Sequence, residues 1–122
     1  MTRINVVPPA ELSRQHLLAE YRELPRIFGL VRRAQARGEQ PNLSEVPRYT
    51  LGKGHVRFFY PRLAWLMARY VVLKDEMKRR GYKVRDYPDN IADGIKHGWW
   101  QHWEITEEAL TINRARIKER TR

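Results

Sequence analysis

The sequence predicts an all-α fold, a compact single domain of three main helices joined by long irregular connections. Three stretches carry apolar residues at helical spacing, over residues 10–37, 61–80 and 107–120. The segments between them, 37–60 and 82–103, are broken by Gly and Pro and show no sustained alternation of apolar and polar residues. Because 122 residues fit one domain, we expect residues 1–122 to fold as a single unit.

The first predicted helix, residues 10–37, begins after two prolines and ends before Gly38. Pro25 lies inside this stretch. Because proline removes a backbone donor and crowds the preceding turn, we expect a kink at Pro25. At about 100° per residue, one narrow sector of the helix gathers apolar residues that should face the core. They are Leu17, Tyr21, Leu24 and Phe28.

The opposite face of this helix is polar. Around a small alanine it groups one acid with two arginines, a histidine and an amide: Gln15, His16, Ala19, Arg22, Glu23 and Arg26. Neighbouring positive charge should keep the Glu23 carboxylate ionised. The pattern alone leaves two interpretations open, a solvent-exposed face with ordinary ion pairs such as Glu23 with Arg26, or a binding site. Glu20 lies toward the side of the helix, and we interpret it as a salt-bridging residue.

The second predicted helix, residues 61–80, has a proline at its start and a glycine just beyond its end. Its apolar residues recur at helical spacing: Leu63, Leu66, Met67, Tyr70, Leu73 and Met77. In the third predicted helix, residues 107–120, Thr106 can cap the first turn, and two glutamates complement the positive end of the dipole. Its inward face is marked by Leu110, Asn113 or Arg114, and Ile117.

The charge balance indicates a polyanionic partner. Lys and Arg number 24 against 14 Asp and Glu, so the formal net charge is +10. The arginines are scattered through the predicted helices, which favours a charged face over a charged tail. Nucleic acid is therefore the first candidate partner, ahead of an anionic membrane surface or an acidic protein. We interpret Trp99, Trp100 and Trp103 as core residues, with base stacking as the alternative.

Several other classes of protein are excluded or disfavoured. Cysteine is absent, which excludes disulfides, thiolate metal sites and cysteine nucleophiles. No stretch approaches the roughly 20 apolar residues of a membrane span, and no secretory signal pattern appears. His97 and His102 lack a partner at metal-binding spacing, so we expect no metal and no other cofactor. We expect a cytoplasmic protein with access to chromosomal or phage DNA.

Several short runs carry a family resemblance. They are Met-Thr-Arg-Ile-Asn at residues 1–5, Ala-Glu-Tyr-Arg-Glu-Leu-Pro-Arg at 19–26, Gly-His-Val at 54–56 and Phe-Phe-Tyr at 58–60. Weaker matches occur at Lys78-Arg79, Gly81 and Ala115-Arg116-Ile117. Together they closely resemble endonuclease V of the T-even phages, a pyrimidine-dimer DNA glycosylase with abasic-site lyase activity. The resemblance covers nearly the whole chain, and the run over 19–26 is highly specific.

This resemblance implies a mechanism. Removal of the initiator methionine leaves Thr2 as the N-terminus, and its free α-amine attacks the sugar that bears the damaged base. The base departs, an imine joins enzyme to DNA, and β-elimination breaks the strand. An α-amine has a reference pKa near 7.7–8.0, so part of it is neutral and nucleophilic at neutral pH. Glu23 matches the family's catalytic carboxylate, which would stabilise developing charge on the sugar and shuttle protons.

The resemblance also implies a set of DNA-binding residues. Arg3, His16, Arg22 and Arg26 match residues that surround the active site and hold phosphates, and Gln15 lies on the same face. Arg116 matches an arginine near the DNA backbone, and Arg120 stands where the family has a lysine. Lys53 and His55 lie in a Gly-Lys-Gly-His run that we interpret equally as a basic turn touching a phosphate or as an ordinary turn.

The expected partner is double-stranded DNA containing cyclobutane pyrimidine dimers, other damaged bases or abasic sites, bound by a monomer. Two alternatives remain: a lyase that lacks dimer specificity, and a non-enzymatic basic DNA-binding module. The phage enzyme continues past the third helix into a tail rich in Trp, Tyr and Lys that is associated with contact to the dimer. This sequence ends at Arg122, so we expect cleavage at abasic sites to be more robust than cleavage at dimers.

Overall fold

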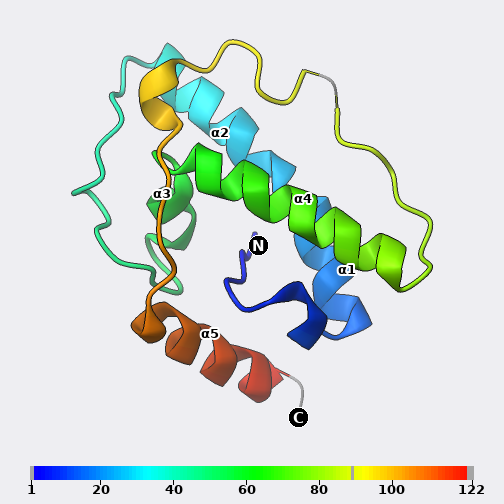
Figure 1. Ribbon diagram of the computed structural model, residues 1–122. Coiled ribbons are helices and arrows are strands. Elements are labelled where there is room, and N and C mark those ends of the chain that lie inside the picture. The colour runs from blue at the N-terminus through cyan, green and yellow to red at the C-terminus, as the bar shows by residue number, and fades with distance from the viewer. Residues whose placement is uncertain (1, 89, 121–122) are drawn as a thin grey trace.

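The computed structural model describes residues 2–88 and 90–120, and these residues form helices and no β-strand (Figure 1). In chain order the elements are η1 (Pro9–Glu11), α1 (Arg14–Glu23), α2 (Pro25–Ala36), α3 (His55–Phe59), α4 (Leu63–Arg79), η2 (His97–Trp99) and α5 (Glu107–Arg120). The predicted all-α class is confirmed. The three long helical units are the joined pair α1–α2, then α4, then α5.

The first predicted helix is a joined pair that starts later than expected. The Ser13 hydroxyl accepts a hydrogen bond from the His16 N–H at 3.2 Å and caps α1, which begins at Arg14 and not at residue 10. The residues before Ser13 form the separate 3₁₀ turn η1 instead. The predicted kink is confirmed, since the joined helix bends by 26° where Pro25 begins α2.

The second and third long units lie close to the predicted ranges. In α5 the Thr106 hydroxyl accepts a hydrogen bond from the Ala109 N–H at 3.0 Å, as expected of a cap. Of the two candidates for its inward face, Asn113 is fully buried, whereas Arg114 is exposed and pairs with Glu11. The short helix α3 was not predicted, because five residues are too few to show a helical period.

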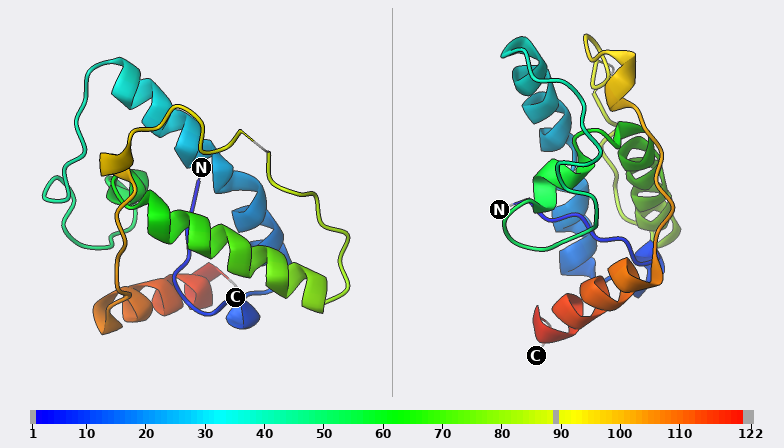
Figure 2. Two further views of the ribbon diagram at one scale, coloured as in Figure 1. Left: turned by 45° about the horizontal axis from the view of Figure 1, so that its top comes forward. Right: turned by 90° about the vertical axis from the view of Figure 1, so that its left-hand side faces the viewer.

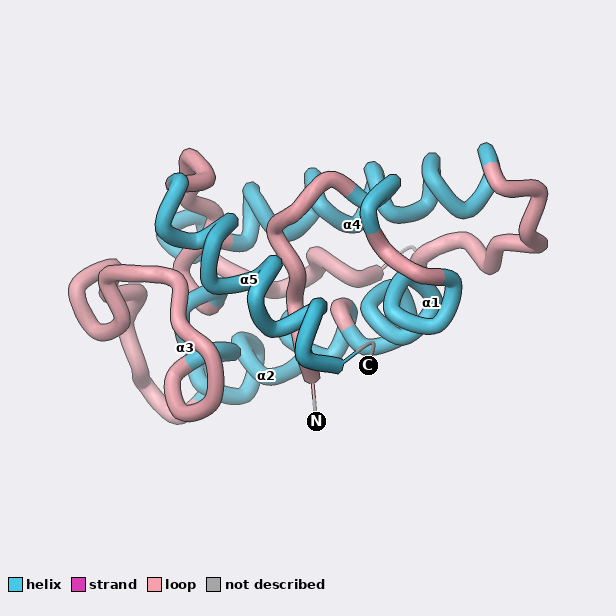
Figure 3. The backbone as a smooth tube through the Cα atoms, turned by 90° about the horizontal axis from the view of Figure 1, so that it is seen from below, coloured by secondary structure: helices cyan, strands magenta, loops and turns pink. Residues whose placement is uncertain are grey.

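The core lies between the α1–α2 pair and α4, and α1 packs against α4. Helix α5 lies apart from them, at the bottom of Figure 1, and Figure 2 shows the same arrangement from two other sides. The predicted core face of the first helix is confirmed, because its four apolar residues are buried. Trp99 is buried, and Trp100 and Trp103 are half-buried against aromatic residues of the core, which supports their interpretation as core residues. The long connections run around the outside of the helices (Figure 3).

The N-terminal segment, residues 2–8, runs through the middle of this arrangement between α4 and α5 (Figures 1 and 2). It is neither helix nor strand, so side chains must satisfy its backbone. Asn113 Oδ1 accepts hydrogen bonds from the N–H groups of Val6 and Val7, at 2.6 and 3.1 Å. Arg69 donates to the Val7 carbonyl at 2.6 Å. Helices α4 and α5 therefore hold this segment from two sides.

A buried ion pair joins α1 to this network. Arg69 Nε lies 2.8 Å from Glu20 Oε2, and the two side chains are 4% and 1% exposed. Glu20 also accepts a hydrogen bond from Asn5 at 2.9 Å, and Asn113 donates to Asn5 at 2.8 Å. The salt-bridging role of Glu20 is confirmed, although its partner is on α4 and the side chain is buried rather than on the side of the helix.

Three other arginines act as clamps on backbone carbonyls. Arg62 is buried and donates to the Phe58 carbonyl at 2.6 Å, Arg80 donates to the Leu12 carbonyl at 2.7 Å, and Arg32 donates to the Asp93 carbonyl at 2.6 Å. Each one ties a helix to a connecting segment. Part of the large positive charge is therefore used to build the fold.

We predict that Glu20→Gln lowers the free energy of unfolding by about 3 kcal/mol, because the substitution leaves the Arg69 guanidinium buried without its counter-charge. The matched control is Glu23→Gln, which makes the same chemical change one turn later on α1 at a half-buried position and should cost less than about 0.5 kcal/mol. Urea denaturation of both variants measures the difference. Equal stability of the two variants would contradict this account of the ion pair.

Candidate functional site

A narrow cavity opens between the polar face of α1, the N-terminal segment and the last turns of α5. It has a volume of about 70 Å³, and it lies beside a more open hollow of about 240 Å³. Five residues line both: Arg3, His16, Ala19, Glu23 and Arg120. We call this pair of hollows the candidate site. Asn5, Glu20, Arg116 and Ile117 complete the inner wall.

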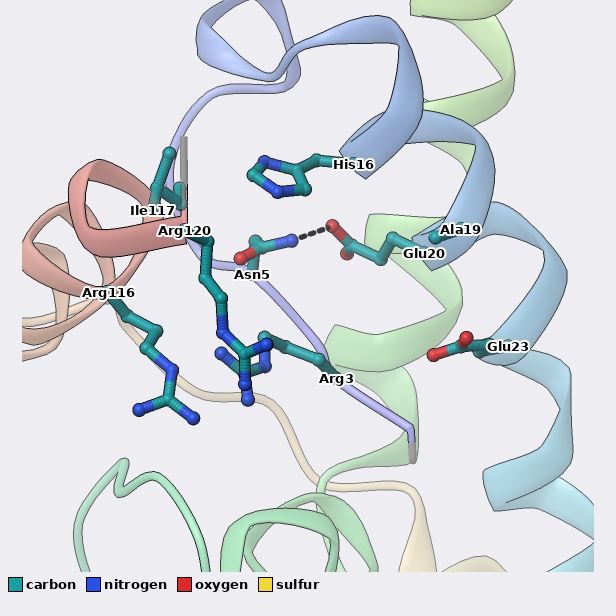
Figure 4. A pocket seen from close by; sticks show the side chains of 9 residues that line it. All are labelled: Arg3, Asn5, His16, Ala19, Glu20, Glu23, Arg116, Ile117 and Arg120. Carbon is teal, nitrogen blue, oxygen red and sulfur yellow. Dashed lines mark hydrogen bonds between the residues drawn. The ribbon is translucent and has the colours of Figure 1, made fainter. Parts of the chain in front are cut away.

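The helical period explains how α1 contributes. His16, Ala19 and Glu23 are three and four residues apart, so they lie on one face of the helix and point into the same space. Ala19 is the smallest side chain in the wall of the candidate site and leaves room between His16 and Glu23. Figure 4 shows the Glu23 carboxylate on one side of the candidate site and three arginines on the other.

These three residues, Arg3, Arg116 and Arg120, form a cluster of positive charge. They come from the N-terminal segment and from α5, and their side chains extend toward the same region (Figure 4). Burial and the two neighbouring guanidinium groups of Arg116 and Arg120 lower the pKa of Arg3. The shift has the sign expected of cations held close together, and an anion placed among them would relieve the repulsion.

Two atoms in the wall of the candidate site are buried and have no hydrogen-bond partner among the residues that the structure describes. They are Nδ1 of His16 and Nε of Arg116. A buried polar atom without a partner costs roughly 1–3 kcal/mol, so an acceptor entering the candidate site would gain from meeting the Arg116 donor. With the arginine cluster, this points to an anionic ligand such as a phosphate.

Three predicted site residues, two on α1 and one at the start of α2, lie away from the cavity. Gln15, Arg22 and Arg26 are exposed, and none of them lines the candidate site. Arg22 instead lines a separate cleft of about 670 Å³ with two tyrosines, Tyr21 and Tyr70. Exposed arginines that flank a cavity remain available to a large polyanion, so their predicted role in DNA binding stands as a prediction.

The two predicted residues near the Gly-Lys-Gly turn have different surroundings. Lys53 is exposed, in a turn whose glycines have left-handed backbone conformations. His55 is buried, and both its ring nitrogens are engaged with backbone groups, of Ile4 and Thr50. The interpretation of His55 as a phosphate ligand is therefore wrong for this conformation, because the imidazole faces the N-terminal segment and not the surface.

Sequence reasoning missed the residues that hold the candidate site together. Asn5 and Glu20 lie in its inner wall, and Asn113 lies behind it. The signals that could have found them were a lone asparagine on the inward face of the third helix and an arginine, Arg69, on the apolar face of the second. Buried polar side chains need partners, so the two together indicate a buried polar network.

Metal and membrane features are absent from the described part of the chain. No group of three or more His, Asp or Glu side chains there could hold a metal ion. None of its helices has the length and apolar character needed to cross a bilayer.

The chain was compared with models of known protein families. The family model described as pyrimidine dimer DNA glycosylase matches residues 1–87. The matched range contains the N-terminal segment and the whole polar face of α1, and it also contains α4 with Arg69.

We predict that Arg116→Ala and Arg120→Ala each weaken binding to undamaged duplex and reduce the salt slope by about 0.9, because each arginine neutralises one phosphate. Binding would be measured by fluorescence anisotropy over a range of salt concentrations. Arg114→Ala is the matched control, since Arg114 lies on the same helix but is paired with Glu11 at 2.9 Å. A slope that changes equally in all three variants would show that net charge alone, and not the arginine cluster, governs binding.

Proposed function

The chain belongs to the pyrimidine dimer DNA glycosylase family, and we propose that it breaks a glycosidic bond of the dimer by forming an imine with the Thr2 α-amine and then cleaves the strand by β-elimination. The family supplies the substrate, a pyrimidine dimer in DNA, and the class of reaction, cleavage of a glycosidic bond. The identity of the nucleophile, the lyase step and the roles of individual residues are the content of the proposal.

One observation supports the proposed mechanism. The Glu23 carboxylate faces Arg3, Arg116 and Arg120 across a narrow cavity whose wall includes the N-terminal segment (Figure 4). Thr2 directly precedes Arg3 and is half-buried. Thr2 itself does not line the cavity, but a free amine at Thr2 would stand next to Arg3 in the chain, at the end of the segment that lines the cavity with the carboxylate and the cations. These are the three groups that imine formation on a deoxyribose in DNA requires.

The chemistry proceeds in two stages. The neutral amine of Thr2 forms a bond to the anomeric carbon, and the glycosidic bond to the base breaks, with its electron pair leaving on the base, which takes up a proton. Opening of the sugar gives an imine between Thr2 and the former anomeric carbon. Glu23 then accepts a proton from the adjacent sugar carbon, and the bond to the 3′ phosphate oxygen breaks. Water hydrolyses the imine and frees Thr2.

The charges of the candidate site suit these stages. An ionised Glu23 would stabilise the positive charge that develops on the sugar as the base leaves, and the same carboxylate would act as base in the elimination. Arg3, Arg116 and Arg120 would hold the flanking phosphates and the phosphate that leaves. Positive charge beside an amine favours its neutral, nucleophilic form.

The cleft beside Arg22 supports a second part of the proposal, which concerns where a base turned out of the duplex is bound. The family resemblance implies that a base opposite the lesion is turned out of the duplex, which costs a few kcal/mol. The cleft has a volume of about 670 Å³, and Tyr21, Pro25 and Tyr70 line it together with Arg22. Arg22 is exposed, and its guanidinium plane can stack on a base. We propose that this cleft receives the extrahelical base.

Borohydride trapping tests the proposal directly. We predict a covalent enzyme–DNA complex on duplexes with a cis-syn thymine dimer or an abasic site and none on undamaged duplex, because only the first two lead to an imine at Thr2. A chain that keeps Met1, or one with an acetylated N-terminus, is the matched control and should trap no DNA. Trapping on abasic sites alone would support a lyase without dimer specificity. Binding without trapping on any duplex would indicate a non-enzymatic module.

We further predict that Glu23→Gln lowers the rate of strand cleavage by about 10²–10⁴-fold, because the amide keeps the size of the side chain but loses the charge and the proton acceptor. Affinity for undamaged duplex should remain, since Glu23 is not a phosphate ligand. Gel analysis of single-turnover cleavage gives the rate. The control is Glu119→Gln, an exposed acid on α5 that does not line the candidate site. Cleavage by Glu23→Gln at the wild-type rate would mean that another carboxylate carries the chemistry.

A further inference from the structure

His55 makes two hydrogen bonds that tie the N-terminal segment to the loop before α3. Its Nε2 lies 2.8 Å from the Ile4 nitrogen, and its Nδ1 lies 2.7 Å from the Thr50 carbonyl oxygen. The side chain is 5% exposed. Its ring is also held edge-on against Tyr49 and Phe59, at centroid distances of 5.5 and 5.6 Å. The imidazole therefore has little freedom to move.

These partners fix the proton on the ring. A carbonyl oxygen only accepts, so Nδ1 must carry a hydrogen and donate to Thr50. The Ile4 N–H only donates, so Nε2 must be unprotonated and accept. The contacts thus select one neutral tautomer of His55. A doubly protonated ring would place two donors face to face at Ile4 and would lose that hydrogen bond.

Tyr49 completes a clamp around the same residue. Its hydroxyl donates to the Ile4 carbonyl at 3.0 Å, so both backbone groups of Ile4 are held from the segment that leads into α3. Ile4 lies two residues after Thr2. Asn113 holds the next stretch, at Val6 and Val7. The clamp at Ile4 is the hydrogen-bonded support nearest to Thr2 that these contacts provide.

We propose that His55 is a positioning residue, which holds Ile4 through its unprotonated Nε2 and thereby keeps the Thr2 amine directed at the substrate. The inference rests on the proposed function, in which Thr2 is the nucleophile. His55 does not touch the reacting atoms. It acts because a nucleophile displaced by about 1 Å can lose about 100-fold in rate.

The surroundings of His55 keep it neutral. Burial lowers its pKa, and the positive charge of Arg3 lowers it further, against the opposing effect of the hydrogen bond to Thr50. Tyr49 faces the ring with its hydroxyl engaged at Ile4, and burial raises the pKa of that hydroxyl, so it also remains neutral. Because the pKa of His55 lies below its ordinary value, the clamp is complete at neutral pH. It should open as the pH falls through the pKa in the folded state.

Four variants test the inference. His55→Phe keeps a ring but removes both hydrogen bonds, His55→Gln can keep an acceptor near the Nε2 position, and Phe59→Leu loosens the same aromatic cluster without touching Ile4. The single-turnover rate of borohydride trapping on an abasic duplex, the affinity for that duplex and hydrogen exchange at the Ile4 amide would be measured for each. Tyr49→Phe, which removes only the hydroxyl donor to Ile4, tests the clamp in case His55→Phe does not fold.

We predict that His55→Phe lowers the trapping rate by about 100-fold at unchanged DNA affinity and exposes the Ile4 amide to exchange. His55→Gln should recover most of the trapping rate. Its rate should also fall less than that of the wild type as the pH is lowered, because glutamine does not titrate. Phe59→Leu should lower the rate far less than His55→Phe, because it leaves both hydrogen bonds of His55 in place, and Tyr49→Phe should lower the rate in the same direction as His55→Phe. Equal rates in His55→Phe and wild type, or equal losses in His55→Phe and Phe59→Leu, would overturn the inference alone. A wild-type enzyme that traps no DNA would instead overturn the proposed function.

Discussion

The buried ion pair between Glu20 and Arg69 is the interaction on which the arrangement of this molecule depends. Removing two charges from water costs several kcal/mol each, so such a pair is tolerated only when its remaining donors and acceptors are satisfied. Here they are, because Glu20 also binds Asn5 and Arg69 also binds the Val7 carbonyl. The pair therefore joins α1 to α4 and draws the N-terminal segment between them. Without it, Asn5 would lose its partner on α1 and the Val7 carbonyl would lose its partner on α4.

This arrangement suits the proposed role of the N-terminal segment, which has no regular secondary structure, as part of an active site. A terminal segment usually frays, since it has few contacts. In this protein, side chains from α4, α5 and the segment leading into α3 bind its backbone at Ile4, Val6 and Val7. These hydrogen bonds restrict the motion of the segment, and this restriction extends to the adjoining residues Arg3 and Thr2. Preorganisation of this kind is what a nucleophile on the main chain needs.

The arginines divide into two groups with different tasks. Arg62, Arg69 and Arg80 are turned inward or along the surface and bind backbone carbonyls or carboxylates. Arg3, in contrast, lies beside Arg116 and Arg120 at the cavity, where burial and these two positive charges lower the pKa of Arg3. The formal net charge of +10 therefore overstates what is free to meet DNA. The proposed function uses the part of this charge that Arg3, Arg116 and Arg120 gather at the cavity.

The sequence was informative about features that are local and less so about features that depend on tertiary contacts. The three long helical units follow from the spacing of residues such as Leu17, Leu66 and Leu73, and Pro25 marks the kink. The polar face of α1 also follows from the helical period. The partner of Glu20 and the roles of Asn113 and His55 do not, because each depends on a residue more than ten positions away in the chain. A helical wheel cannot show such partners.

The most direct test of this account is to find the atom that joins the enzyme to DNA. The borohydride-reduced complex with an abasic duplex would be digested with a nuclease and a protease, and the modified peptide would be sequenced by mass spectrometry. The account predicts that the sugar remnant is on the α-nitrogen of Thr2. A remnant on a lysine side chain, such as that of Lys53 or Lys118, would contradict it and would assign the clamped N-terminal segment a purely structural role.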